Sequence, residues 1–151
     1  MSASPAPSKR HVLVPLPWLK AHEKHVEQRV AELVHHFELR NAIDYAIVAD
    51  ERTGTVIDGH HRLMALRQLG AAWAPVYLID YASPAITVHT WREGEKAPSK
   101  EEVVERAARG ELYPPKSTRH DFVRMLDPVD VPLEVLRDPT AGGRATWEPR
   151  P

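Results

Sequence analysis

The stretch TVIDGHHRLMALRQLG, residues 55–70, decides the fold of this chain. It begins with an apolar run that is typical of a buried strand. Asp58 and Gly59 then form a tight turn, and residues 60–69 carry leucines at helical spacing. Gly70 stands where a glycine commonly ends a helix. The stretch therefore predicts a strand, a glycine turn and a helix in immediate succession.

Apolar runs and helical patterns alternate on both sides of this stretch. The expected strands are 11–16, 45–49, 55–57, 75–80 and 86–91, and the expected helices are 23–37, 60–69 and 99–109. Ser99 and Glu102 have the spacing of a capping box at the start of the third helix, and Gly110 ends it. Elements interleaved at this density predict one small α/β or α+β domain.

The two ends of the chain differ in composition from this central part. Residues 1–10 are rich in Ser, Ala, Pro, Lys and Arg and predict a flexible arm. Residues 127–151 contain five prolines and a glycine pair, which predict a mostly extended Pro-rich tail with one short apolar turn at 131–136. We therefore expect the domain to span residues 11–126.

The overall charge and the absence of cysteine exclude several classes of protein. The 151 residues carry 20 Lys and Arg against 21 Asp and Glu, so bulk charge does not favour binding to nucleic acid or to an acidic membrane. No cysteine is present, which excludes disulfides, thiolate nucleophiles and Cys-based zinc sites. With no signal peptide or membrane-length apolar run, we expect a cytoplasmic protein.

The turn at 58–62 is the first candidate site. A helix N-terminus exposes unpaired N–H groups that favour anions such as phosphate, and His60, His61 and Arg62 add donors beside it. Asp58 could cap the helix, hold a metal ion or act on a substrate proton. The alternative is that Asp58 is an ordinary cap and the three basic residues form a solvated surface.

The second candidate is the segment GELYPPKSTRH, residues 110–120. Two prolines stiffen its start, and five donor side chains follow: Lys116, Ser117, Thr118, Arg119 and His120. Such a loop is suited to gripping phosphate or carboxylate oxygens. The alternative is a basic loop exposed to solvent.

Two further residues are weaker candidates on their local pattern. Glu23 lies between His22 and His25 at the start of the first expected helix, but the spacing is not that of a zinc-binding HExxH motif, so it predicts a polar helix start. Trp91 is expected in the core or in a pocket wall.

An ordered set of motifs resembles the free serine kinase family of the ParB/sulfiredoxin-like superfamily. Within residues 11–120 the motifs are VPLPWLKAHE, DGHHRLMALRQLG, APVYLIDY, ITVHTW and SKEEVVERAARGELYPPKSTRH. The resemblance implies an α+β fold, a compact ParB/sulfiredoxin-like single domain with a small mixed sheet packed by helices. It also implies a phosphotransferase that uses ATP or ADP, with Mg²⁺, to convert free L-serine to O-phospho-L-serine.

The same resemblance assigns roles to individual residues. It implies that Asp58, Gly59, His60, His61 and Arg62 form the nucleotide-phosphate turn, with Arg62 and the histidines offsetting negative charge. Glu23 is the implied catalytic glutamate, with either Glu23 or Asp58 taking the hydroxyl proton and Asp58 as the metal ligand. Trp91, Lys116, Ser117, Thr118, Arg119 and His120 are implied to bind the small-molecule substrate.

Related activities differ at recognisable positions. Sulfiredoxin chemistry requires a cysteine where this chain has His60, so that activity is excluded. A ParB-like nucleotide-binding module without small-molecule phosphorylation stays open. A nuclease dependent on Asp58 also stays open, although the near-neutral charge disfavours it. The better-known kinases are longer, with an additional stretch before the PPK motif that this chain lacks.

Overall fold

The computed structural model describes residues 10–122 and 126–141. Its largest sheet has the order β1-β5-β3-β4. The strands are β1 (Val12–Pro15), β3 (Ile47–Asp50), β4 (Val56–Asp58) and β5 (Trp73–Ile79). Strand β5 runs antiparallel to β1 and parallel to β3, while β3 and β4 form an antiparallel pair. The sheet is therefore small and mixed, as expected.

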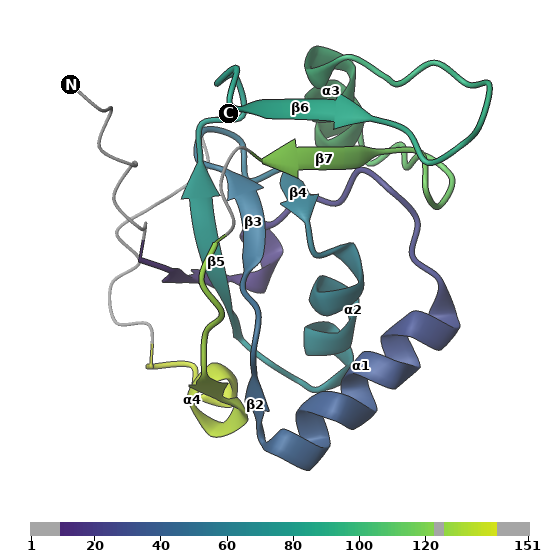
Figure 1. The fold of residues 1–151 in the computed structure, drawn as a ribbon. Helices are drawn as coiled ribbons and strands as arrows, with labels where there is room; N and C mark the ends of the chain where they lie inside the picture. Colours follow the sequence, from purple (N-terminus) through teal and green to yellow (C-terminus); the bar gives the residue numbers. More distant parts are fainter. Residues whose placement is uncertain (1–9, 123–125, 142–151) are drawn as a thin grey trace.

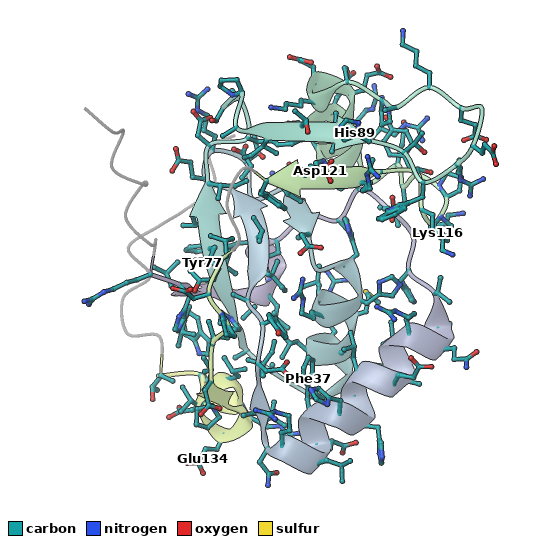
Figure 2. All side chains as sticks on the ribbon, in the orientation of Figure 1. Phe37, Tyr77, His89, Lys116, Asp121 and Glu134 are labelled. Carbon is teal, nitrogen blue, oxygen red and sulfur yellow. The ribbon has the colours of Figure 1, made fainter. Side chains whose placement is uncertain are left out.

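Two helices cover one side of this sheet, α1 (Glu27–Arg40) and α2 (His60–Gln68), and they pack against each other (Figure 1). A short 3₁₀ helix, η1 (Leu16–Trp18), follows β1. Phe37 of α1 and Leu63 of α2 are almost completely buried in the core that these elements share (Figure 2). Burying such side chains stabilises the fold by roughly 1.5–3 kcal/mol each.

The first helix begins later than the expected residue 23. The backbone around Glu23 instead forms a parallel bridge with Tyr113, in which the Lys24 N–H donates to the Tyr113 carbonyl and the Tyr113 N–H donates to the His22 carbonyl. A helix starting at Glu23 cannot form at the same time, because these backbone groups are committed to another segment. The expected helical start was therefore wrong by one turn.

A second layer lies across one end of the sheet (Figure 1). It consists of an antiparallel ribbon, β6 (Ile86–His89) with β7 (Arg119–Phe122), and helix α3 (Lys100–Arg109). The capping box of Ser99 with Glu102 is present. The segment 110–120, expected as a basic loop, thus ends in strand β7. The sequence did not predict this strand, because its residues are largely polar and lack the apolar alternation of a strand. The expected strand 86–91 ends two residues early.

The chain after residue 126 returns to the opposite end of the sheet. Strand β8 (Val131–Pro132) pairs with β2 (Ala42–Ile43), and helix α4 (Leu133–Arg137) follows. Leu133 and Leu136 of α4 are buried in the main core. The expected apolar turn is therefore a packed helix. Residues 1–9 of the expected arm and 142–151 of the expected tail lie outside the described residues.

Among the residues described, no helix is both long enough and apolar enough to cross a membrane.

Candidate active site

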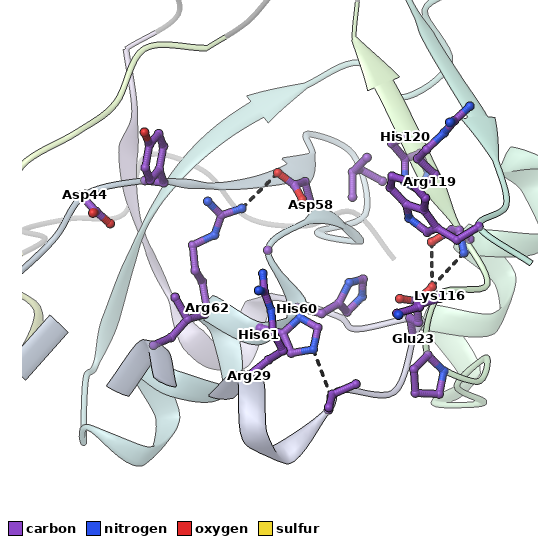
Figure 3. A pocket seen from close by; sticks show the side chains of 18 of the residues that line it. Glu23, Arg29, Asp44, Asp58, His60, His61, Arg62, Lys116, Arg119 and His120 are labelled. Atoms are coloured by element: carbon purple, nitrogen blue, oxygen red, sulfur yellow. Dashed lines mark hydrogen bonds and ion pairs between the residues drawn. The ribbon is translucent and has the colours of Figure 1, made fainter. Parts of the chain in front are cut away.

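A cavity of about 650 Å³ lies between the start of α2, the first turns of α1 and the ribbon β6–β7 (Figure 3). Every residue that the sequence analysis proposed for the site lines this cavity, with the exception of Ser117. The fold therefore brings the turn at 58–62, Glu23, Trp91 and the segment 116–120 into one place. The enclosed space is in the size range of small-molecule binding sites.

The turn before α2 leaves the helix N-terminus open to the cavity. Gly59 is the N-cap residue, with φ of 110°, and no side chain caps the helix. Asp58 does not cap it, because its carboxylate accepts a hydrogen bond of 3.0 Å from the guanidinium of Arg62. The first N–H groups of α2 are therefore available to an anion.

His60 and His61 do not contribute positive charge to this turn. The Nε2 atom of His60 accepts from the backbone N–H of His22 at 3.1 Å, and the Nε2 atom of His61 accepts from the Val26 N–H at 3.0 Å. Burial is the main cause that lowers the pKa of both rings, and that of His60 falls well below 6.5. Both Nε2 atoms act as acceptors here, so Arg62 is the side chain of the turn that carries a fixed positive charge.

Glu23 enters the cavity from an extended segment, held in a ring of backbone donors. Its Oε1 accepts from the Thr118 N–H at 2.9 Å and from the Thr118 hydroxyl at 3.0 Å (Figure 3). The backbone N–H groups of Lys116 and Ser117 also lower the pKa of this carboxylate. Lys116 has a left-handed φ of 64°, the kind of turn that brings successive N–H groups together around an anion.

Two opposing influences act on the pKa of Glu23. Burial raises it above the ordinary value, and this is the larger effect, while the hydrogen bonds from the segment 116–118 lower it. The segment was expected to grip a carboxylate or phosphate of the substrate. The Thr118 hydroxyl instead donates to Glu23, and the Ser117 hydroxyl donates to the Pro114 carbonyl at 2.6 Å, while the side chains of Lys116 and Arg119 line the cavity.

His22 lies directly behind Glu23 and was not recognised as a site residue from the sequence. Its ring is completely buried, with Nδ1 2.9 Å from the Val56 carbonyl oxygen and Nε2 2.9 Å from the Thr118 hydroxyl. Burial, with a smaller contribution from His120, lowers its pKa to about 3. Both nitrogens are engaged, so His22 does not share a metal with His25, and the described residues contain no cluster of three or more potential metal ligands.

The ribbon β6–β7 supplies the opposite wall of the cavity. The Nε2 atom of His120 lies at a hydrogen-bonding distance of 2.7 Å from the Tyr81 hydroxyl, and burial lowers the pKa of His120 to about 4. Trp91 is 62% exposed, and its ring centre lies 5.2 Å from the guanidinium carbon of Arg119. Trp91 is thus part of the cavity wall and not of the core.

The far end of the cavity is formed by residues that the sequence analysis missed. They come from α1 and from the segment before β3: Arg29, Leu33, Phe37, Asp44 and Tyr45. Leu33 and Phe37 belong to a helical apolar face, which indicates a core position as readily as a cavity wall. Tyr45 is 53% exposed, an aromatic ring presented to the solvent side of the cavity.

The sequence is similar to curated L-serine kinases of archaea. It is 36% identical over 103 residues to an ATP-dependent L-serine kinase of Desulfurococcus mucosus, a match that covers 66% of this chain and 40% of the relative. It is 32% identical over 106 residues to an ADP-dependent L-serine kinase of Thermococcus kodakarensis, with 66% and 43% coverage. The chain thus spans about two fifths of the length of these relatives. No protein-family model matches it.

The fold is that of a solved free serine kinase. A structure described as a Glu-to-Gln variant of that enzyme in complex with AMP superimposes with a TM-score of 0.80, covering 87% of this chain and 96% of the other, at 21% identity. This likeness confirms the expected fold class. The sequence matches and the shared fold agree with the resemblance that the motifs indicated.

Proposed function

We propose that this chain catalyses the transfer of a phosphoryl group from ATP or ADP to the hydroxyl group of free L-serine, which gives O-phospho-L-serine. The observation that carries the proposal is a half-buried carboxylate with a raised pKa, Glu23, in the same cavity as the uncapped N-terminus of α2. A proton acceptor and an anion-binding element together are what hydroxyl phosphorylation requires.

The donor phosphates bind at the start of α2 in this proposal. The free N–H groups after Gly59 and the positive end of the helix dipole favour a phosphate there. Arg62, whose side chain is 17% exposed, adds a fixed positive charge beside them. Such preorganised charge stabilises the transferring phosphoryl group, which carries most of the negative charge of the transition state.

Mg²⁺ fits the residues of this turn as an ion that arrives with the nucleotide. Asp58 offers a carboxylate that lines the cavity, is 58% exposed and accepts a hydrogen bond from Arg62. Magnesium commonly takes one or two protein carboxylates and completes its shell with phosphate and water oxygens. Asp58 would hold the ion, and the ion would neutralise part of the negative charge of the nucleotide phosphates.

Glu23 acts as the general base. Its carboxylate accepts the proton of the serine hydroxyl while the serine oxygen forms a bond to the terminal phosphorus of the nucleotide. The bond between that phosphorus and the bridging oxygen breaks, and ATP leaves as ADP, or ADP as AMP. A raised pKa makes the carboxylate a stronger base than an exposed glutamate.

The opposite wall of the cavity binds the serine molecule. Lys116 and Arg119 both line the cavity and carry the charge that complements the serine carboxylate, and the ring of Trp91 covers the acceptor. The thiol-free composition is compatible with the expected cytoplasmic location.

Mass spectrometry tests the function directly. Purified protein is incubated with Mg²⁺, L-serine and either ATP or ADP, and the products are analysed for O-phosphoserine and for the cleaved nucleotide. O-phosphoserine in either reaction is the expected result and identifies the donor. Nucleotide cleavage without phosphoserine contradicts serine as the acceptor. Binding without turnover by folded protein supports the ParB-like nucleotide-binding module instead.

A further inference from the structure

We propose that His22 is a positioning residue that competes with Glu23 for the single hydroxyl proton of Thr118, and that this competition drives Glu23 toward its protonated form. The place of this coupling in the reaction rests on the proposed function, in which Glu23 accepts the serine proton. The coupling itself is a property of the free protein.

The hydrogen-bond partners of His22 determine where its proton lies. A carbonyl oxygen can only accept, so the Nδ1 atom, 2.9 Å from the Val56 oxygen, carries the proton. The ring is completely buried and its pKa is lowered to about 3, so it is neutral near pH 7 and its Nε2 atom bears a lone pair. That lone pair faces the Thr118 hydroxyl at 2.9 Å and requires a donor.

Thr118 cannot satisfy both of its neighbours when Glu23 is ionised. Its hydroxyl has one proton, while its oxygen lies 3.0 Å from Oε1 of Glu23 and 2.9 Å from Nε2 of His22. If the hydroxyl donates to the carboxylate, a lone pair of the Thr118 oxygen faces the lone pair of the His22 Nε2 atom. A buried acceptor that is left without a donor is unfavourable.

Protonation of Glu23 removes this conflict. The carboxylic acid proton is donated to the Thr118 oxygen, and the Thr118 hydroxyl rotates to donate to His22. The chain from Glu23 through Thr118 and His22 to the Val56 carbonyl then has one donor and one acceptor at every contact. When Glu23 takes the serine proton, the same rotation stabilises the product of that transfer.

The backbone around this chain keeps its members in place. His22 donates its own N–H to Nε2 of His60 and accepts at its carbonyl from the Tyr113 N–H, so the backbone is fixed immediately before Glu23. Among the described residues, titratable and charged groups of other segments lie around the chain. Those facing His22 are His60, Tyr113 and His120, and those sharing the cavity with Glu23 include Asp58, Lys116 and Arg119.

Carboxyl ¹³C NMR of the full chain, without nucleotide or serine, measures the coupling. Loss of one signal in Glu23→Gln assigns the resonance of Glu23. The test variant is His22→Asn, whose shorter amide can still donate to the Val56 carbonyl but lacks an acceptor at the Nε2 position. We expect its Glu23 pKa to be lower than in the wild type, because Thr118 is then free to donate to the carboxylate at every pH.

Two threonine variants provide matched controls. Thr118→Ser keeps the hydroxyl, so adding His22→Asn to it should still lower the Glu23 pKa. Thr118→Val removes the hydroxyl, and adding His22→Asn to it should leave the Glu23 pKa unchanged. An unchanged or raised Glu23 pKa in folded His22→Asn protein overturns the proposal, as does an equal effect of that substitution with and without the hydroxyl.

The wild-type protein gives a second measurement if His22→Asn does not fold. The ¹⁵N shift of the His22 Nε2 atom should change as Glu23 titrates, and this response should be absent in Thr118→Val. A constant Nε2 shift through the Glu23 titration contradicts the coupling.

Failure of the coupling and failure of the proposed function give different results. A coupled Glu23 in a protein that makes no O-phosphoserine refutes the kinase and leaves the coupling intact. In an active enzyme, His22→Asn should move the acidic limb of the pH profile of kcat/KM to lower pH. A merely structural role for His22 would lower kcat/KM at all pH values without moving that limb.

Discussion

Glu23 combines two features that single residues seldom show together. Its carboxylate is half-buried, which disfavours the charge, and it accepts hydrogen bonds from the N–H and hydroxyl groups of Thr118, which favour the charge. A carboxylate with burial alone would stay protonated, and one with the N–H groups alone would be a weak base. Burial is the larger of the two influences, so the pKa of Glu23 stays above that of an exposed glutamate and the carboxylate is a stronger base.

Replacing Glu23 by glutamine tests this role at the residue scale. The amide keeps the size of the side chain and an oxygen for the Thr118 N–H, but it cannot accept a proton. We expect the rate of serine phosphorylation to fall by about 10²–10⁴-fold. Initial rates of O-phosphoserine formation, with circular dichroism as the check on folding, measure the effect.

Glu27→Gln is the matched control, because Glu27 begins α1 four residues later and its side chain is 78% exposed. We expect it to keep close to the wild-type rate. A folded Glu23→Gln protein as active as Glu27→Gln would exclude Glu23 as the base.

At the scale of elements, the start of α2 requires glycine at position 59. Gly59 has φ of 110°, and a Cβ atom there would lie 3.1 Å from both the Arg62 Nε atom and the Ile47 Cγ1 atom. An L-residue with a side chain is strained in this backbone conformation. The added methyl group would also displace the guanidinium that pairs with Asp58.

Gly59→Ala should therefore harm both stability and nucleotide binding. We expect a loss of about 1–3 kcal/mol in the free energy of unfolding and a nucleotide affinity about tenfold weaker, equivalent to about 1.4 kcal/mol. Urea unfolding and calorimetric titration with ADP measure the two effects.

Gly70→Ala serves as the control at the other end of α2. Gly70 also has a positive φ, of 73°, but a Cβ atom there meets nothing within 4 Å. We expect it to lose some stability and to bind ADP as the wild type does. Equal losses of affinity in both variants would show that Arg62 and the turn are not specifically involved.

Elements with a strong local pattern were predictable from the sequence, and those made by distant partners were not. The pattern of strand, glycine turn and helix at 55–70 and the capping box at Ser99 are local signals. The helices that they predict, α2 and α3, are both present. Strand β7 is polar and exists because β6 pairs with it. The bridge between Glu23 and Tyr113, which displaces the start of α1, joins segments 90 residues apart in the chain.

At the scale of the whole molecule, the candidate site is assembled from segments that sequence reasoning could identify but not arrange. The motif resemblance named Glu23, the turn at 58–62 and the segment 116–120, and all three line one cavity. It did not reveal His22, because the burial of this histidine depends on contacts with distant segments and has no local signature. It also assigned charge to His60, whose burial is a consequence of tertiary packing.

The packing of α4 predicts that residues 131–137 stabilise the domain. Leu136 is completely buried in the main core, and the Leu136 carbonyl accepts from the Ala72 N–H at 2.7 Å. Leu136→Ala should lower the free energy of unfolding by about 2–5 kcal/mol. The exposed Glu134→Ala on the same helix is the control and should change it by less than about 0.5 kcal/mol. Similar urea midpoints for the two variants would mean that α4 is not part of the cooperative unit.

The buried histidines make the stability of the whole molecule depend on pH. His22 and His120 have pKa values of about 3 and about 4 in the folded protein, against 6.5 for an unhindered imidazole. At pH values between the pKa of the folded protein and 6.5, these two rings bind protons in the unfolded chain but not in the folded protein. The stability that these two rings contribute is therefore fully present above pH 6.5 and is lost as the pH falls toward 4 and then 3.

Each of these two histidines adds about 1.4 kcal/mol per pH unit to the slope once the unfolded chain is protonated, so together they lower the free energy of unfolding by roughly 2.7 kcal/mol per unit near pH 5. His60, whose pKa also lies well below 6.5, makes the fall steeper. Glu23 opposes this trend, because its raised pKa makes the folded protein bind a proton there. Urea unfolding at pH 7, 6 and 5 in the Glu23→Gln background therefore isolates the histidines. Adding His120→Gln should reduce the slope by about 1.4 kcal/mol per pH unit, whereas a free energy of unfolding that stays constant from pH 7 to 5 would show that these rings are protonated in the folded protein.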